Sequence, residues 1–296
     1  MVDSVLNKDI KKKLENSQNF LYNDKLVGQL IEKSNIQKED TVIEIGPGKG
    51  IITKQLAKKC SKVCAIEYDP YLYKKLNKMF YNIENVEIRH GDFLEFRLPE
   101  KRKYKVFSSI PYNITAAILS KLTSSSNPPE EAYLIIQEEA ARKYAGNPYN
   151  KESMRSLLLK PYFDLEIIYK LKPTDFKPIP SVNSVLLHIS KRKKALINKN
   201  QADLYRDFIA YIFKRSGNMR ERCKYIFSPK QLKRLSKEVG FSMTDCPAYI
   251  TFQQWLKVFQ YYIIGVSDGK KRLVHGSYSR LQDEQKKIDK IHRSRK

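Results

Sequence analysis

The chain has 296 residues, which is room for one large domain and a smaller one. Hydrophobic residues make up 41% of it, enough for a packed core, and this excludes wholesale disorder. The formal net charge of +24 favours a polyanionic partner, above all nucleic acid, although a lysine-rich solvated surface would give the same charge.

Several other classes are disfavoured by what the sequence lacks. We expect no membrane span, because no apolar run reaches about 18 residues. Asp3, Asp9 and Glu15 argue against a transit peptide, and no signal-peptide core is visible, so we expect a cytoplasmic protein. The 4 cysteines form no Cys-x-x-Cys pair and the 4 histidines are scattered, so we expect buried free thiols and no metal site.

An amide-rich segment, residues 16–19, precedes the first predicted helix. Amide side chains both donate and accept hydrogen bonds, which suits a ligand that carries a carboxylate and an ammonium, but a turn would explain them equally well. Apolar residues at helical spacing predict a helix over residues 24–34, with Asp24 as the candidate N-cap.

The segment Thr41–Gly50 predicts a buried strand that ends in a glycine turn, followed by a helix from Ile51 to about Lys59. Glycine lets the backbone turn with positive φ and approach a ligand closely, and the N-terminus of the next helix attracts polar or anionic groups. The pattern from Glu44 to Gly50, Glu-x-Gly-x-Gly-x-Gly, resembles the first motif of methyltransferases that use S-adenosylmethionine (AdoMet). Another nucleotide or a structural turn remains an alternative.

Two further acids follow predicted strands. Residues 63–67 form a second strand that ends in Glu67, about 20 residues beyond the glycines, the interval at which nucleotide-binding folds place an acid on the ribose. Residues 86–88 form a third strand that leads to Asp92, whose alternative role is a turn cap. Asp69 and Pro70 predict the start of a helix between these strands.

A stiff loop follows the fourth predicted strand, residues 104–107. Pro111 fixes its own φ and removes a donor, so the loop presents Tyr112 in a restricted conformation. Residues 132–136 predict a fifth strand, and residues 163–169 and 182–189 predict an antiparallel pair at one edge of the sheet.

Strands that alternate with helices indicate an α/β fold: a Rossmann-like, mostly parallel sheet with one antiparallel edge pair, and ligands at the carboxyl ends of the strands. We assign residues 1–194 to this catalytic domain and residues 195–263, which have helical periodicity, to a small helical domain. Basic residues beside its first helix are candidate phosphate contacts or a solvated face: Lys214, Arg215, Arg220, Arg222 and Lys224.

The remaining residues, 264–296, form a basic C-terminal tail. Leu281 and Ile288 are too few apolar residues to build a core, so we expect a mobile arm that adds sequence-independent affinity for RNA and can be deleted without loss of the fold.

Taken together, the motifs resemble the rRNA adenine N6-dimethyltransferases over about residues 14–260. The matching segments keep the family's order: Ser17–Leu21, Glu44–Gly50, Glu67, Gly91–Phe93, Ser109–Tyr112, and Asp175–Pro180 with Ser181–Ser184. Within the family, Ile110–Ile114 and Thr251–Leu256 resemble the erythromycin-resistance (Erm) branch, which modifies large-subunit (23S) rRNA.

The resemblance implies a role for each motif. AdoMet would be bound by Asn19, Leu21, Gly46, Gly48, Gly50, Glu67, Asp92, Phe93 and Ser109, with Glu67 on the ribose and Asp92 on the adenine amine. The target adenine would lie at Ser109, Ile110, Pro111, Tyr112 and Phe176, stacked between the rings of Tyr112 and Phe176.

The expected function is AdoMet-dependent methylation of an adenine amine in 23S rRNA before full ribosome assembly, by a monomer that needs no metal. The consequence would be resistance to macrolide, lincosamide and streptogramin antibiotics. Ser109 departs from the family, which has asparagine there, and this bears on the second methylation. The alternatives are a small-subunit rRNA dimethyltransferase of ribosome assembly and a non-catalytic RNA-binding relative.

Overall fold

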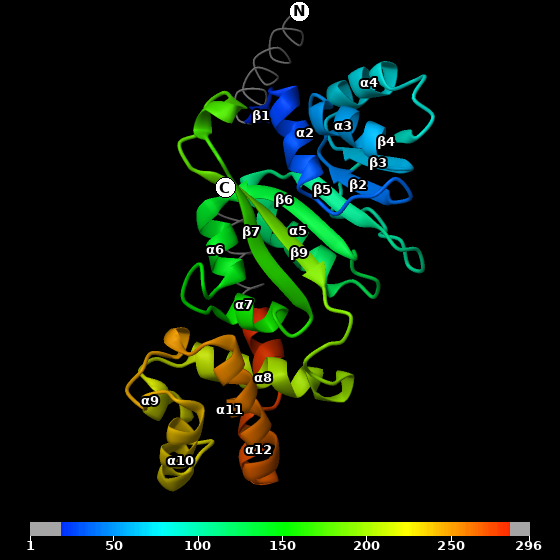
Figure 1. The fold of residues 1–296 in the computed structure, drawn as a ribbon. Coiled ribbons are helices and arrows are strands. Elements are labelled where there is room, and N and C mark those ends of the chain that lie inside the picture. The colour runs from blue at the N-terminus through cyan, green and yellow to red at the C-terminus, as the bar shows by residue number, and fades with distance from the viewer. Residues whose placement is uncertain (1–18, 285–296) are drawn as a thin grey trace, which may run out of the picture. The chain divides into compact units, whose positions relative to one another are not determined.

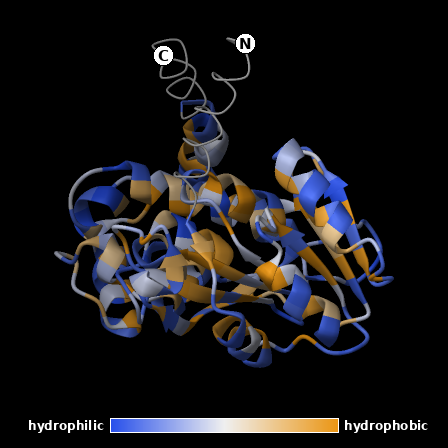
Figure 2. Ribbon diagram, turned by 90° about the horizontal axis from the view of Figure 1, so that it is seen from above, coloured by the Kyte–Doolittle hydropathy of each residue, from blue (hydrophilic) through white to orange (hydrophobic). Residues whose placement is uncertain are grey.

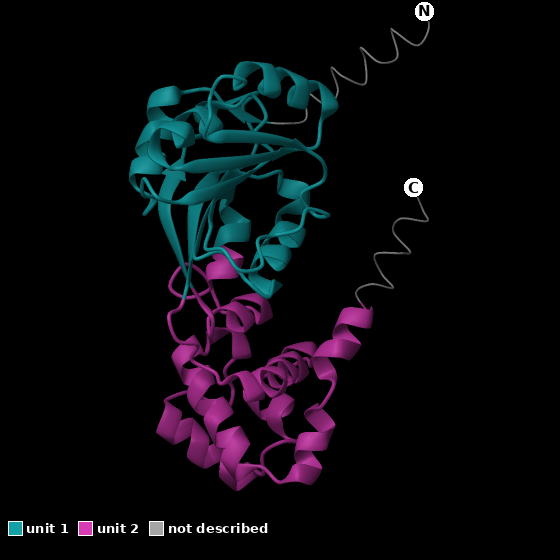
Figure 3. Ribbon diagram, turned by 90° about the vertical axis from the view of Figure 1, so that its right-hand side faces the viewer, with its two compact units in different colours: residues 1–141, 164–191 teal, residues 142–163, 192–296 magenta. Residues whose placement is uncertain are grey.

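The computed structural model describes residues 19–284, which form two compact units (Figure 3). Unit 1 takes residues 19–141 and 164–191, and unit 2 takes residues 142–163 and 192–284. The division into domains of residues 1–194 and 195–263 stays a prediction. By packing, the segment 142–163 groups with the C-terminal helices.

A seven-stranded sheet forms the centre of unit 1, in the order β4-β3-β2-β5-β6-β9-β7 (Figure 1). Neighbours from β4 to β6 are parallel, and β9 runs antiparallel to β6. The predicted sheet, mostly parallel with an antiparallel edge, is therefore confirmed. Its strands are β2 (Thr41–Ile45), β3 (Lys62–Glu67), β4 (Val86–His90), β5 (Lys105–Ser109), β6 (Glu131–Gln137), β7 (Phe163–Leu171) and β9 (Ser184–Lys191).

Unit 1 also contains a two-stranded sheet that the sequence patterns did not predict. Strands β1 (Phe20–Leu21) and β8 (Phe176–Lys177) pair antiparallel, with Leu21 opposite Phe176. Two residues per strand are too short for any periodicity, so only the fold brings these segments together.

The helices of unit 1 cover the sheet. Leu30 of α2 and Leu56 of α3 share one buried cluster with Phe107 of β5, and Figure 2 shows hydrophobic residues running along the strands. Asn23, not Asp24, caps α2, because its side chain accepts from the N–H groups of Lys25 and Leu26. The helical elements are α2 (Asp24–Glu32), α3 (Ile51–Lys59), α4 (Pro70–Met79), η1 (Tyr112–Ile114), α5 (Thr115–Ser124) and η2 (Pro173–Asp175), while α6 (Glu138–Ala145) begins in unit 1 and ends in unit 2.

In unit 2, the predicted helical character of residues 195–263 is confirmed. Its core gathers Phe208, Trp255, Phe259 and Tyr262, all 2% exposed or less. The elements are α7 (Met154–Leu159), η3 (Lys199–Gln201), α8 (Ala202–Lys214), α9 (Met219–Cys223), α10 (Pro229–Val239), η4 (Pro247–Tyr249), α11 (Phe252–Gly265) and α12 (Asp268–Val274).

The prediction of a mobile arm is wrong for residues 266–284. Val266 and Val274 are buried in the core of unit 2, and the Asp207 carboxylate accepts from the N–H groups of Gly276, at 2.7 Å, and Tyr278, at 2.9 Å. These two valines, and not Leu281, attach the segment to the core. The rest of the predicted arm, residues 285–296, lies outside the described residues.

The cysteine prediction is confirmed in part: Cys60, Cys64 and Cys223 are free and buried, whereas Cys246 is free and exposed. Within the described part of the chain, no helix is both long and apolar enough to cross a membrane.

Candidate functional site

The site is built at the carboxyl edge of the parallel strands. Because β4, β3, β2 and β5 are parallel neighbours, the segments that follow them meet at one edge of the sheet. Hydrogen bonds tie these segments to the next strand: the Gly46 N–H donates to the Ile66 carbonyl and the Gly91 N–H to the Glu67 carbonyl, both at 2.9 Å.

The glycine turn needs its glycines for different reasons. Gly46, Gly48 and Gly50 all have positive φ, at 63°, 59° and 79°. A Cβ on Gly46 would have no atom within 4 Å, so open space adjoins that position and a ligand has room there. A Cβ on Gly48 would lie 2.7 Å from the Phe20 ring, and one on Gly50 would lie 2.8 Å from Leu76.

Glu67 lies beside this turn, as predicted from its place at a strand end. Its Oε2 accepts from the Gly48 N–H at 3.0 Å and its Oε1 from the Asp69 N–H at 2.9 Å. Burial raises the pKa of Glu67, although these backbone donors favour the carboxylate. Since each carboxylate oxygen has two lone pairs, the group can still accept from hydroxyls such as those of a ribose.

Glu44 is a second buried acid, to which the sequence analysis gave no role of its own. It is 1% exposed, and its Oε2 accepts from the Thr53 hydroxyl at 2.6 Å. Its Oε1 is buried and has no hydrogen-bond partner among the described residues. Burial raises its pKa to about 8. A polar cofactor bound at the adjoining glycine turn would give this oxygen the hydrogen-bond partner that it lacks.

The remaining predicted cofactor residues have distinct surroundings. Asn19 is half-buried and Leu21 is in the core. Asp92 Oδ1 accepts from the Leu94 N–H at 2.8 Å, which makes Asp92 a turn cap with a second oxygen to spare, and Phe93 next to it is buried. The open glycine turn, the acids and the orphaned Glu44 oxygen fit a cofactor with hydroxyls, amines and an ammonium, as AdoMet has.

Tyr112 follows β5 and contacts Ser184, a residue of the segment Ser181–Ser184 to which no individual role was assigned from the sequence. Its hydroxyl lies 2.7 Å from that of Ser184, which is 2% exposed. The resemblance pointed to the segment that contains Ser184, but not to its contact with Tyr112. Ser109 ends β5, and it does not cap the next helix, because the N-caps of η1 and α5 are Pro111 and Ile114 without side-chain bonds.

Phe176 is buried and does not offer an open surface on which a base could stack. Its ring is 2% exposed and shares a buried cluster with Leu21 and Leu171. The β1–β8 pair brings it to the same small sheet as the N-terminal motif, and the Tyr22 hydroxyl adds a bond to the Thr174 carbonyl at 2.9 Å. The described residues contain no cluster of acids, histidines and cysteines placed to hold a metal ion.

This sheet order, with glycines and acids at its carboxyl edge, defines a Rossmann-like methyltransferase that uses AdoMet. The chain matches the ribosomal RNA adenine dimethylase family over residues 9–263. It is 33% identical over 258 residues to an rRNA adenine N-6-methyltransferase of Bacteroides fragilis, covering 84% of this chain and 94% of the relative. A relative of the same name from Streptococcus sanguinis is 31% identical over 256 residues, covering 86% and 98% of the two chains.

Among solved structures, the chain is similar to the 23S rRNA methyltransferase ErmE, with a TM-score of 0.77 and 27% identity over 83% of this chain and 100% of that one. The protein therefore belongs to the ribosomal RNA adenine dimethylase family. It is an AdoMet-dependent enzyme that methylates the exocyclic amine of adenine in rRNA. AdoMet supplies a methyl group already activated by its sulfonium, so the protein's task is to position the two reactants.

Proposed function

We propose that this enzyme methylates an adenine of large-subunit (23S) rRNA, before the ribosome is fully assembled, and so confers resistance to macrolide, lincosamide and streptogramin antibiotics. The similarity to ErmE along the whole of that chain carries the proposal. The net charge of +24 suits a polyanionic substrate. We further propose that the protein acts as a monomer in the cytoplasm.

For the cofactor, we assign Gly46, Gly48 and Gly50 to the methionine and ribose, and Glu67 to the ribose hydroxyls. Asp92 accepts from the adenine amine of AdoMet, beside Phe93. Asn19, Leu21 and the backbone around them contact the methionine end. The hydrogen bond between Gly48 and Glu67 supports this assignment, because it holds the glycine turn and the acid as one unit.

For the target, the adenine amine is a poor nucleophile because its lone pair is delocalised into the ring. Acceptors aimed at its protons favour a more pyramidal, more reactive nitrogen. We assign this role to the Ser109 hydroxyl and the Ile110 carbonyl, ahead of the rigid Pro111. Tyr112 stacks on the base, which compensates for the stacking that the base loses when it leaves the RNA helix.

The assigned role of Phe176, on the other face of the adenine, requires a change of conformation. A ring that is 2% exposed cannot stack on a base. We therefore propose that the β1–β8 pair opens when RNA binds. Only Phe20↔Lys177 and Leu21↔Phe176 are paired in this sheet, so few backbone hydrogen bonds oppose its opening.

We propose that residues 195–263 form a helical domain within unit 2 and that this domain binds RNA.

The whole proposal is tested by expressing the enzyme in a macrolide-susceptible bacterium and mapping methylated adenines in both rRNAs by mass spectrometry. We expect N6-methylated adenine in 23S rRNA together with raised macrolide tolerance, and neither with Tyr112→Ala. Methylation confined to small-subunit rRNA would contradict the proposal.

A further inference from the structure

The basic residues beside α8 and α9 in unit 2 divide into two kinds. Lys214 pairs with Glu284 at 2.5 Å, and Arg222 donates to the carbonyls of Gly217, at 2.7 Å, and Ile212, at 3.1 Å. These side chains make their polar contacts within unit 2. Arg215 and Lys224 instead lie against aromatic rings, which points to a different use.

Tyr225 is the exposed member of this group. Its side chain is 51% exposed, with Arg215 Cζ 5.2 Å and Lys224 Nζ 4.9 Å from its ring centroid. The next two residues, Ile226 and Phe227, are buried, and both of their N–H groups donate to the Cys223 carbonyl at 2.9 Å. A tight, anchored turn therefore presents the ring to solvent with two cations near it.

Tyr249 in η4 repeats this arrangement on the same unit. It is 61% exposed, and Lys151 Nζ lies 4.3 Å from its ring centroid. The following Ile250 is buried, and Thr251 and Gln254 form a capping box that fixes the start of α11. This ring, too, is presented by a rigid part of the backbone.

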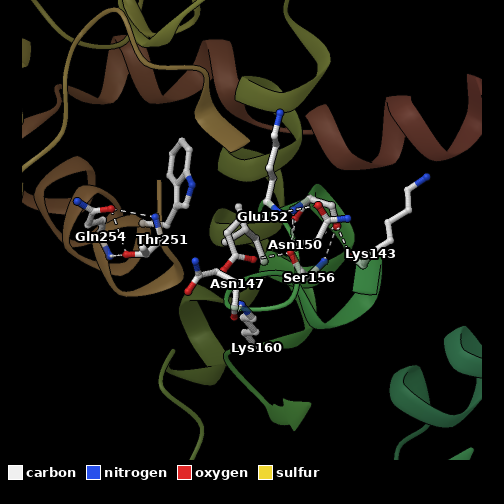
Figure 4. Close-up of polar contacts among 12 residues, drawn as sticks. Lys143, Asn147, Asn150, Glu152, Ser156, Lys160, Thr251 and Gln254 are labelled. Carbon is white, nitrogen blue, oxygen red and sulfur yellow. Dashed lines mark hydrogen bonds and ion pairs between the residues drawn. The ribbon is translucent and has the colours of Figure 1, made fainter. Parts of the chain in front are cut away.

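Figure 4 shows a polar network around the buried Glu152, the residue that follows Lys151 in the chain. The Glu152 N–H donates to the Ala248 carbonyl at 2.8 Å. Because Glu152 follows Lys151 and Ala248 precedes Tyr249, this bond ties together the two backbone segments that carry Lys151 and Tyr249. The Glu152 carboxylate pairs with Lys160 at 2.5 Å and accepts from the Ser156 hydroxyl at 2.6 Å. Since breaking a buried ion pair is strongly destabilising, this network fixes the backbone at Glu152, next to Lys151.

We propose that Tyr225 and Tyr249, with Arg215, Lys224 and Lys151, form two stacking platforms for unpaired bases of the rRNA substrate. Every base has a π-face that can stack on tyrosine, while the flanking cations neutralise the adjoining phosphates. An acidic protein partner would use the cations but would leave the exposed tyrosine rings without a stacking partner. This inference rests on the proposed function in so far as the substrate is rRNA.

The test compares two ligands of equal charge. A single-stranded oligoadenylate of on the order of 15 nucleotides offers bases and phosphates, and an abasic ribose-phosphate oligomer of the same length offers phosphates alone. For Tyr225→Ala and Tyr249→Ala, each in the full chain, we expect about fivefold or greater loss of affinity for the oligoadenylate and unchanged affinity for the abasic oligomer. The phenylalanine variants should retain wild-type affinity for both.

Tyr81→Ala serves as the matched control, because Tyr81 is 83% exposed and lies in unit 1. Unchanged oligoadenylate affinity in both unit 2 variants, or equal loss on both ligands, would overturn the inference. Methyl transfer to 23S rRNA by the wild type is measured alongside. An inactive wild type would contradict the proposed function, whereas the two-ligand comparison decides the platforms independently.

Discussion

The hydroxyl groups of Tyr112 and Ser184 lie 2.7 Å apart, although 72 residues separate them in the chain. Ser184 is the first residue of β9, pairs with Gln137 of β6 and is 2% exposed. Tyr112 lies in a short 3-10 turn after β5. The central sheet thus holds the far end of the proposed stacking ring through a part-buried hydrogen bond.

Removing this bond should weaken methyl transfer without affecting the cofactor. A typical hydrogen bond contributes about 0.5–1.5 kcal/mol, so we expect Ser184→Ala and Tyr112→Phe each to lower kcat/KM about two- to tenfold. AdoMet affinity, measured by calorimetry, should stay at the wild-type value. Ser181→Ala is the control, because Ser181 is exposed in the same motif.

The double variant separates orientation of the ring from general damage. If both single changes remove the same contact, their effects are not additive, and the double variant loses no more activity than either single one. Additive losses would show that the hydroxyl pair is not what sets the orientation of Tyr112.

Glu44 should make the stability of the cofactor-free enzyme depend on pH. Burial raises its pKa from 4.5 to about 8, so between these values the folded state holds a proton that the unfolded chain releases. The free energy of unfolding therefore falls as pH rises through this window, by on the order of a few kcal/mol for this group. Denaturant unfolding at a series of pH values measures the slope.

Glu44→Gln is the variant for that measurement, because it keeps the size of the side chain and removes its ionisation. Burial raises the pKa of Glu67 as well, so the wild-type slope contains a second contribution of the same sign. The difference between wild type and Glu44→Gln isolates Glu44. Parallel curves for the two proteins would show that Glu44 does not titrate in this window.

The segment after α11 should be part of the fold, not an appendage. Val274 is fully buried in the core of unit 2, so Val274→Ala should lower the free energy of unfolding by about 1–3 kcal/mol through lost apolar contact and a residual cavity. Leu273→Ala is the neighbouring control, since Leu273 is 51% exposed. Equal stability of the two variants, measured by thermal denaturation, would contradict this packing.

The parallel sheet was predictable because β2, β3 and β6 are short runs of mostly apolar residues, and a glycine turn follows β2 while an acid ends β3. For the same reason Gly46, Glu67 and Asp92 could be expected at one edge. The contacts that depend on distant segments could not be predicted: the bond between Tyr112 and Ser184, the β1–β8 pair and the burial of Phe176. Nothing in local periodicity encodes them, because they arise only when strands far apart in sequence become neighbours.

Ser109 should limit the second methylation. Its hydroxyl is closer to the backbone than an asparagine carbonyl would be, and a hydrogen bond stretched well beyond about 3.2 Å contributes little. The monomethylated amine keeps one proton and accepts fewer orientations, so we expect the wild type to leave a visible monomethyladenine fraction. Ser109→Asn should raise the dimethyl fraction, and Ser109→Ala should lower both products. Nucleoside mass spectrometry compares the three, and identical ratios in all of them would refute the idea.

The most direct test of the account is transfer of a labelled methyl group from AdoMet to protein-free 23S and small-subunit rRNA in separate reactions. The wild type should label the N6 position of adenine in 23S rRNA, and Tyr112→Ala should bind AdoMet normally but transfer little, because loss of a stacking ring costs about 1–3 kcal/mol per base. Label on small-subunit rRNA alone, or equal transfer by wild type and Tyr112→Ala, would contradict the account.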